Sequence, residues 1–250
     1  MRNLFTRHKI ILCLITCMEF GTYVKIITKT TGGDKRVKNQ KIPEATVIRL
    51  SVYSRYLTGL EKQGIECVSS GDIAEGVAGN PAQVRKDLAY FGEFGTRGVG
   101  YDVQDLNENI KKILGLNRNW RAIIVGAGNL GAALSQYKGF RDRGFEVLSV
   151  FDNDIKKVGL SLGGLPIEPI SGLEEFLEKN NVDIGIITVP AEYAQNIADI
   201  LVAKGVKSIL NFAPRVIQAP ESVEVRNVDL TVNLEVLTYN AVSGKHEDLD

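Results

Sequence analysis

The segment from Gly126 to Gly131 is the part of the chain best suited to bind a ligand. It follows the apolar run 122–125, and glycines at this spacing allow a tight turn whose backbone approaches a pyrophosphate. A second apolar run, 145–151, ends at Asp152, where a carboxylate can accept hydrogen bonds from ribose hydroxyls. The two segments predict a dinucleotide site that prefers NAD(H) over a cofactor with a 2′-phosphate. The turn residues expected to contact the cofactor are Gly126, Ala127, Gly128, Asn129, Leu130 and Gly131.

Two later segments are expected to complete this site. Apolar runs at 182–189 and 206–210 flank a helical segment, 191–204, which is the alternation of a parallel sheet. Ligands of such sheets lie across the carboxyl ends of the strands, so the nicotinamide is expected there. The residues concerned are Thr188, Val189, Pro190, Asn211, Phe212, Ala213 and Pro214. An ordinary strand-ending turn would explain the last four equally well.

The chain lacks the acid or base that a dehydrogenase needs beside its nicotinamide. Its two histidines are His8 and His246, and no tyrosine is followed four positions later by lysine, the pair of short-chain dehydrogenases. We therefore predict no catalytic residue. An NAD-dependent dehydrogenase and a CoA-binding synthetase-like subunit stay open as alternatives, although Asp152 favours a nucleotide with a ribose diol over CoA.

Upstream of this site, helix signals predict a DNA-reading module over residues 41–115. Pro43 stands at the first position of one helix, and Ser69 with Asp72 forms a capping box for a second. Asn80 is a good N-cap for a third. Two short helices joined by a turn match the helix-turn-helix plan, in which the second helix enters the major groove of DNA.

The third helix is expected to bury Val84, Leu88 and Phe91 and to turn a polar, basic face outward. A glycine-rich segment that follows would form a wing beside it. The residues expected to contact DNA are Gln83, Arg85, Lys86 and Tyr90 on the helix and Arg97 at the tip of the wing. A solvated face of an ordinary helical bundle is the alternative.

Composition limits these interpretations. With 30 Lys and Arg against 30 Asp and Glu, the net charge is +0, so affinity for DNA must come from a local patch. The cysteines Cys13, Cys17 and Cys67 show neither zinc spacing nor an even disulfide framework, so we expect reduced thiols, no metal and a cytoplasmic protein. A length of 250 residues, 44% of them hydrophobic, allows two modest cores.

The first 36 residues differ in character from the rest. Basic residues precede an apolar stretch at 10–18, as in a signal peptide, but no small-residue cleavage site follows. The stretch is shorter than the about 20 residues that span a bilayer, so we expect no membrane segment. We interpret residues 1–36 as upstream read-through before a natural start at Val37, and residues 1–40 as an atypical leader.

Several of these segments together resemble the redox-sensing transcriptional repressor family Rex. They are 83–88 and 90–92, 95–101, 126–131, 151–152 and 211–214, and the resemblance covers residues 38–240. It implies a homodimer that binds palindromic double-stranded operator DNA and is released when NADH replaces NAD⁺. Asn129 departs from some members of that family, which carry arginine there near the pyrophosphate.

The resemblance also implies an α/β chain of two domains and a tail. A winged-helix DNA-binding domain would occupy 41–116 and a Rossmann-like NAD(H)-binding domain 117–232. The C-terminal helix and tail, 233–250, would swap into the partner subunit. A helix that packs on its own subunit is the alternative for the tail.

A triad known in the family maps onto Arg55, Tyr137 and Asp229. In this interpretation the carboxylate of Asp229 meets the positive ring of NAD⁺ or the guanidinium of Arg55, and Tyr137 offers an alternative hydrogen bond. An ordinary salt bridge between Arg55 and Asp229 is the simpler alternative, and exposed pairs of that kind contribute little to stability.

Overall fold

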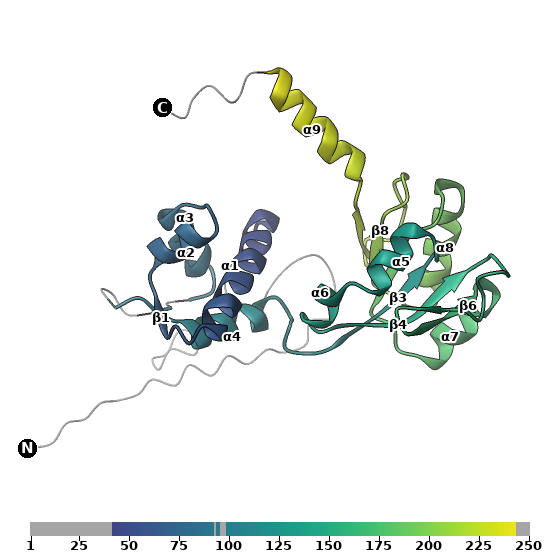
Figure 1. Ribbon diagram of the computed structural model, residues 1–250, viewed down its shortest axis with the longest axis horizontal. Helices are drawn as coiled ribbons and strands as arrows, with labels where there is room; N and C mark the ends of the chain where they lie inside the picture. Colours follow the sequence, from purple (N-terminus) through teal and green to yellow (C-terminus); the bar gives the residue numbers. More distant parts are fainter. Residues whose placement is uncertain (1–41, 93, 96–98, 244–250) are drawn as a thin grey trace, which may run out of the picture. The chain divides into compact units, whose positions relative to one another are not determined.

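The computed structural model describes residues 42–92, 94, 95 and 99–243 (Figure 1). The chain divides into two units between Asn117 and Arg118, with one hydrophobic core in the first unit and two in the second. Arg97 at the tip of the predicted wing and the leader 1–40 lie outside the described residues.

The first unit is helical with one short antiparallel strand pair. Helix α1 packs against α4, and α2 packs against α3. The buried side chains of all four helices, among them Leu50, Leu57, Ile73, Leu88 and Ile110, form a single core. The elements are α1 (Glu44–Lys62), β1 (Cys67–Val68), α2 (Ser70–Gly76), α3 (Pro81–Ala89), β2 (Tyr101–Asp102) and α4 (Val103–Ile113).

The caps of the two short helices form as predicted. The Ser69 hydroxyl accepts hydrogen bonds from the amides of Gly71 and Asp72, and the Asp72 carboxylate accepts one from the Ser69 amide. Asn80 caps α3. The prediction for Pro43 was wrong by one position, because its backbone is extended (ψ 137°) and the helix begins at the next residue.

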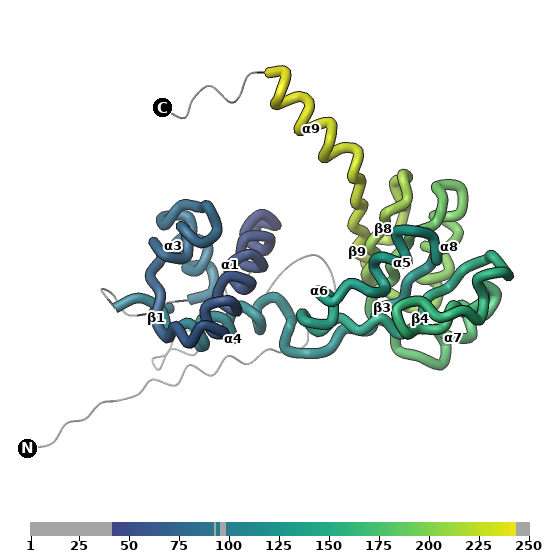
Figure 2. The backbone as a smooth tube through the Cα atoms, in the orientation of Figure 1, coloured from purple at the N-terminus to yellow at the C-terminus, as the bar shows by residue number. Residues whose placement is uncertain are grey.

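The second unit contains a seven-stranded sheet in the order β5-β6-β4-β3-β7-β8-β9. All neighbouring strands run parallel except β5 and β6. The strands are β3 (Trp120–Val125), β4 (Phe145–Asp152), β5 (Ser161–Leu162), β6 (Leu165–Pro169), β7 (Ile184–Ile187), β8 (Ser208–Asn211) and β9 (Glu224–Asn227). The chain runs outward from β3 through β4 to β6, returns to β7 and continues the other way, so the order reverses between β3 and β7. Figure 2 traces the backbone through this sheet, with β3, β4, β8 and β9 labelled.

Helices cover both faces of this sheet and create two cores. Ile123 and Val125 of β3 point to the side where α7 and α8 pack. Their neighbours Ala122 and Ile124 point to the opposite side, which α5 and α6 cover through Leu134 and Phe140. The helices are α5 (Asn129–Ser135), α6 (Lys138–Arg141), α7 (Leu173–Lys179) and α8 (Ala191–Ala203). This is the α/β fold expected from the sequence.

Several predicted boundaries in this unit were wrong. The strand expected over 182–189 is confined to β7, and the one expected over 206–210 begins later and includes Asn211. The helix after the glycine turn ends at Ser135, whose hydroxyl donates to the carbonyl of Ala132 and competes with the helical pattern. Tyr137 therefore precedes a separate helix, α6, instead of closing α5.

The last helix, α9 (Leu230–Val242), begins three residues earlier than the predicted tail boundary at 233. The carboxylate of Asp229 causes this, because it accepts hydrogen bonds from the amides of Thr231 (2.8 Å) and Val232 (3.4 Å). Apart from Asn240, every residue of α9 is exposed. Among the described residues, no helix is both long and apolar enough to cross a membrane, and no group of three metal-ligating side chains gathers.

Candidate functional site

The glycine turn lies where the strand order reverses, between the carboxyl ends of β3 and β7. Gly126 has φ +112°, and a Cβ there would lie 2.6 Å from the Thr188 carbonyl oxygen. A Cβ on Gly131 would collide with the Gly126 carbonyl, whereas one on Gly128 would meet nothing within 4 Å. The first and third glycines are thus required by packing. The second leaves open space in which a pyrophosphate could approach the backbone.

Thr188 connects the ends of β3 and β7 by hydrogen bonds. Its hydroxyl donates to the carbonyl oxygens of Val125 (3.1 Å) and Gly126 (2.8 Å). Ile187 lies in register with Val125 on one side and Asn211 on the other, so the ends of three parallel strands are level. The structure therefore brings together the strand ends from which Thr188–Pro190, Asn211–Pro214 and the glycine turn continue.

Asp152, the last residue of β4, lies beside the same turn and is only 7% exposed. Its carboxylate accepts hydrogen bonds from the amides of Ala127 (2.6 Å) and Asp154 (2.8 Å) and from Nζ of Lys157 (3.2 Å). Burial opposes ionisation, but these three donors outweigh it and hold the pKa of Asp152 below its ordinary value. An anionic acceptor thus stands next to the open glycine.

Asn211 uses its side chain within the protein. Its amide nitrogen donates to the carbonyls of Ala213 (3.2 Å) and Arg215 (2.7 Å) and to Oδ1 of Asn227 (2.8 Å), and its oxygen accepts from the Ala213 amide. Asn211 is fully buried, Phe212 partly buried and Pro214 exposed. Asn211 therefore shapes the loop at this strand end from within the protein.

The predicted DNA-reading face of α3 is only partly outward. Arg85 and Lys86 are exposed, as expected. Gln83 and Tyr90 are less exposed than predicted: both are half-buried, and the Tyr90 ring packs against Phe91 and the core. Their contact with DNA stays a prediction. The guanidinium of Arg85 donates through Nη1 to the hydroxyl of Ser70 at 2.8 Å. Ser70 is the first residue of α2, so this contact joins α3 to α2.

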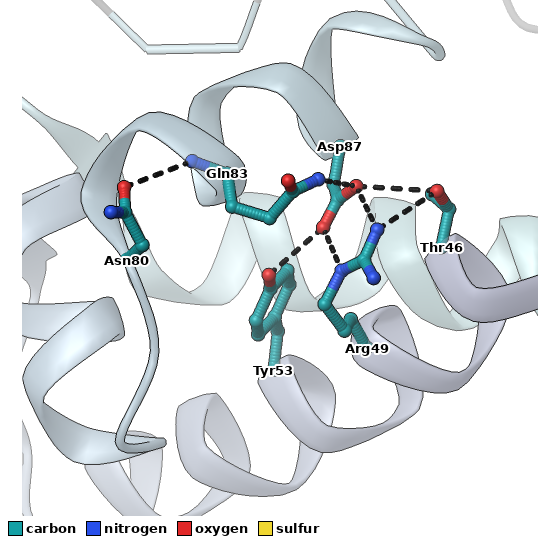
Figure 3. A network of polar contacts seen from close by, with 6 residues as sticks. All are labelled: Thr46, Arg49, Tyr53, Asn80, Gln83 and Asp87. Atoms are coloured by element: carbon teal, nitrogen blue, oxygen red, sulfur yellow. Dashed lines mark hydrogen bonds and ion pairs between the residues drawn. The ribbon is translucent and has the colours of Figure 1, made fainter. Parts of the chain in front are cut away.

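Asp87 is the residue that the sequence analysis missed (Figure 3). Its side chain is fully buried and bridges α3 to α1. It accepts hydrogen bonds from Arg49 Nε (2.6 Å) and Nη2 (2.7 Å), Tyr53 Oη (2.9 Å), Thr46 Oγ1 (3.2 Å) and Gln83 Nε2 (2.8 Å). The sequence did contain a signal, because Asp87 shares the i, i+3, i+4, i+7 stripe with Val84, Leu88 and Phe91, and a carboxylate on an apolar stripe needs partners.

The electrostatics of this cluster favour the ion pair. Burial raises the pKa of Asp87, but hydrogen bonds from Arg49, Gln83 and Tyr53 more than compensate and leave it below its ordinary value. The hydrogen bond to Asp87 raises the pKa of Arg49. Burial, and then the hydrogen bond to Asp87, raises the pKa of Tyr53 to about 12. The carboxylate, the guanidinium and the neutral phenol therefore coexist at neutral pH.

The three predicted switch residues are found in different settings. Arg55 is exposed on α1 in the first unit. Tyr137 is 60% exposed in the second unit and makes an edge-to-face contact with Phe140, with ring centroids 5.2 Å apart. Asp229 caps α9, and its Oδ2 accepts no hydrogen bond from the part of the chain that the structure describes. Their meeting remains a prediction.

Comparisons with known proteins agree with this organisation. A family model described as "Putative DNA-binding protein N-terminus" matches residues 41–89, and one described as "CoA binding domain" matches residues 117–215. The redox-sensing transcriptional repressor Rex of Desulfitobacterium hafniense is 62% identical over 204 residues, which are 82% of this chain and 97% of that protein. Rex of Streptomyces coelicolor is 47% identical over 81% of this chain and 79% of its own length.

Solved structures give the same relationship in three dimensions. A crystal structure of RSP in complex with beta-NAD⁺ and operator DNA has 36% sequence identity and a TM-score of 0.78, and the match covers 82% of this chain and 95% of that one. A structure of RSP in complex with beta-NADH has 35% identity and a TM-score of 0.73, over 82% and 97% of the two chains. RSP is described as a Rex-family repressor.

Proposed function

This chain belongs to the Rex family of redox-sensing transcriptional repressors, and on that premise we propose that it releases a palindromic operator when NADH replaces NAD⁺. Like its relatives, it is a DNA-binding repressor and not an enzyme. One observation carries the proposal: a single chain joins a helix-turn-helix with exposed cations to a dinucleotide turn that is open at Gly128. A bacterial repressor works where the DNA is, so we propose the cytoplasm as its location.

NAD(H) is the cofactor, and the residues at the carboxyl ends of the strands suit it. When bound, it supplies a nicotinamide ring that is positive when oxidised and neutral when reduced. Gly128 leaves room for the pyrophosphate, and the ionised carboxylate of Asp152 can accept hydrogen bonds from a ribose diol. Thr188 and Asn211 hold the strand ends and the loop against which the rest of the dinucleotide would lie. CoA lacks the free diol that would use Asp152 in this way.

We assign the DNA contacts of α3 to Arg85 and Lys86, which would face bases or phosphates when this helix enters the major groove. Both are exposed, whereas Gln83 is committed to Asp87 and Tyr90 to the core. Because the net charge of the chain is +0, these cations have to act as a local patch. Arg97 stays a prediction for the wing.

We propose that the functional form is a homodimer in which α9 packs against a second copy of the chain. An isolated helix of 13 residues is marginal in water, and most helical stability in proteins comes from a packed apolar face. This helix has one charged residue, Glu235, and its apolar side chains are exposed: Leu230, Val232, Leu234, Val236, Leu237, Tyr239 and Val242. Analytical ultracentrifugation of the chain with and without residues 230–250 tests the dimer, and a monomeric full chain would contradict it.

The switch must depend on a difference between two states, since a ligand shifts an equilibrium only by binding one state better than the other. Asp229 is our candidate for sensing the charge of the nicotinamide, with Arg55 and Tyr137 as its alternative partners. Its free Oδ2 makes it available for such an exchange while Oδ1 caps α9.

An electrophoretic mobility shift with the upstream region of its own operon tests the function. We expect retention of the duplex with NAD⁺ and release with NADH. The matched variant is Gly128→Val, because its φ of −76° suits any residue and a Cβ there meets no atom of the protein, yet the side chain would occupy the space of the pyrophosphate. This variant should bind DNA and ignore NADH. A wild-type chain whose DNA binding is indifferent to NADH would overturn the proposal.

A further inference from the structure

A groove of about 600 Å³ opens in the first unit between α1 and the N-terminal part of α3. Lys86 lines this groove and also belongs to the exposed face of α3, so the groove borders the proposed DNA-reading surface. Its lining contains two cations and no carboxylate: Arg49, Val52, Tyr53, Val77, Ala78, Gly79, Asn80, Ala82, Gln83 and Lys86. An anion that entered the groove would meet these two cations.

Hydrogen bonds along one edge of the Arg49 guanidinium, formed by Nε and Nη2, hold the group in one orientation (Figure 3). Nε and Nη2 donate to the two oxygens of Asp87, and Nη2 also donates to Thr46 Oγ1 at 3.2 Å. Nη1 has no hydrogen-bond partner within the described residues, and 35% of the side chain is exposed. Since a guanidinium is planar and rigid, fixing one edge fixes the direction in which the other edge donates.

Several other polar groups of the groove are engaged within the protein. The amides of Ala82 and Gln83 donate to the side chain of Asn80, and the Gln83 side chain donates to Asp87. The start of α3 therefore offers neither of these amides to a ligand. Arg49 and Lys86 are the cationic side chains of the groove that could hold an anion.

We propose that this groove binds a backbone phosphate of double-stranded DNA. Nη1 of Arg49 and the ammonium of Lys86 are the donors, and Asp87 is a positioning residue that sets the guanidinium. The inference rests on the proposed function, because it needs α3 to enter the major groove of DNA. In helix-turn-helix proteins an earlier helix crosses the backbone beside the recognition helix, and phosphate contacts of this kind fix register without reading sequence.

The ion pair between Arg49 and Asp87 determines how Arg49 contributes to DNA binding. The buried carboxylate offsets the charge of Arg49, so Lys86 is the uncompensated cation of the groove. Arg49 then contributes directed hydrogen bonds more than long-range attraction. Loss of Arg49 should therefore weaken binding to operator and to random DNA by the same factor. On the operator, the loss should come from one particular phosphate in each half-site.

The test replaces single phosphates by neutral methylphosphonates in a duplex that the wild-type protein selects from a random pool. Affinities are measured by fluorescence anisotropy for wild type, Lys86→Gln and the double variant Arg49→Gln/Asp87→Asn. The double variant leaves no orphaned charge in the core, and Lys86→Gln covers the case in which it does not fold. Lys62→Gln removes an exposed cation at the other end of α1, about 20 Å along the helix axis, and serves as the control.

We expect one methylphosphonate position in each half-site to weaken wild-type binding roughly tenfold, the cost of a lost charge-assisted hydrogen bond. That position should have almost no effect on the Arg49 or Lys86 variants and its full effect on Lys62→Gln. A uniform loss at every position would show a merely structural role and overturn the inference. If wild type binds DNA and responds to NADH but no phosphate couples to these residues, only the inference fails. If wild type selects no duplex, the proposed function fails with it.

Discussion

Asp87 in the first unit and Asp152 in the second are both buried carboxylates, but the protein uses their oxygens to different extents. Asp87 has no exposed surface and receives hydrogen bonds from four side chains, one of which donates twice. Asp152 is 7% exposed and accepts hydrogen bonds from two backbone amides and, at 3.2 Å, from the ammonium of Lys157. A carboxylate has about four lone-pair sites. The first is saturated, and the second retains capacity.

This difference separates a scaffold from a ligand site. No ligand can donate a hydrogen bond to Asp87 without displacing one of its donors, all of which lie on α1 except Gln83. Asp152 can accept one more donor, and the flexible, partly exposed Lys157 can leave. Arg85 likewise retains spare donors, because its guanidinium donates only through Nη1, to Ser70. Spare hydrogen-bonding capacity, more than residue type, marks the groups available to partners.

The largest effect should follow from breaking the saturated site. Asp87→Ala leaves Arg49 without its partner, and loss of one member of a buried ion pair costs 3–5 kcal/mol in typical cases. Because Arg49 is partly exposed, we expect about 3 kcal/mol, confined to the first unit. The only tryptophan, Trp120, lies in β3 of the second unit, so urea unfolding followed by circular dichroism should shift while the Trp120 fluorescence transition stays unchanged.

Two outcomes would contradict this expectation. A shift of less than about 1 kcal/mol would mean that the network contributes no more than an ordinary hydrogen bond. An equal shift of the Trp120 transition would mean that the two units unfold together. Asp87→Asn, which keeps an acceptor and loses the charge, should lie between wild type and Asp87→Ala.

The next effect belongs to the site with spare capacity. Asp152→Ala should lower NADH affinity about 10- to 100-fold, the range for hydrogen bonds to a charged group, and bring the affinities for NADH and NADPH closer together. Fluorescence titration with both cofactors measures this. Lys157→Gln is the companion variant, because it removes the cation that could tolerate a 2′-phosphate and should widen the preference for NADH. An unchanged ratio in Asp152→Ala would mean that the residue does not recognise the ribose.

Local signals in the sequence predicted the parts of the molecule that depend on neighbouring residues. The capping box of Ser69 and Asp72, the cap at Asn80, the glycine turn and Asp152 all act over a few positions or close a strand, and all occur where expected. Boundaries such as the start of α9 were missed, because a single side-chain cap at Asp229 decides them.

Contacts between distant segments were beyond that reasoning. The donors to Asp87 on α1 lie 34 to 41 positions away, so spacing along the chain carries no trace of them. Gln83 and Tyr90 are less exposed than predicted for the same reason, since a helix face is fully outward only where no other element packs against it. The pairing of Arg55 with Asp229 depends on tertiary arrangement in the same way and stays a prediction.

A third prediction concerns Arg85, whose guanidinium has spare donors. If it makes a bidentate base contact, Arg85→Ala should cost about 1–3 kcal/mol on the operator and relax specificity at one position of each half-site. Ser70→Ala is the matched control, because it removes the hydroxyl that Arg85 contacts without removing the cation. Equal losses on operator and random DNA would assign Arg85 to a phosphate instead.

The variant Asp229→Asn tests whether the carboxylate that caps α9 also senses the cofactor through its free oxygen. The ratio of operator affinities at saturating NAD⁺ and NADH should fall about tenfold in Asp229→Asn, near the middle of typical coupling energies. Asparagine caps helices as well as aspartate does, so α9 should persist and NADH should still bind. An intact ratio would leave Asp229 as a helix cap or an ordinary salt-bridge partner.

The smallest effect should come from Tyr53, the neutral member of the saturated site. Tyr53→Phe removes one hydrogen bond to Asp87 and should cost about 1 kcal/mol at neutral pH. The pH dependence is more specific. The folded state raises the pKa of Tyr53 from 10.0 to about 12, so the associated stability is complete below pH 10 and is lost as the pH rises toward 12. Wild type should therefore destabilise more steeply than Tyr53→Phe across this window, and the tyrosinate absorbance of folded wild type should contain one late-titrating phenol that the variant lacks. Identical alkaline profiles would show that Tyr53 is not held neutral by burial and Asp87, and the description of that site as saturated would lose one of its donors.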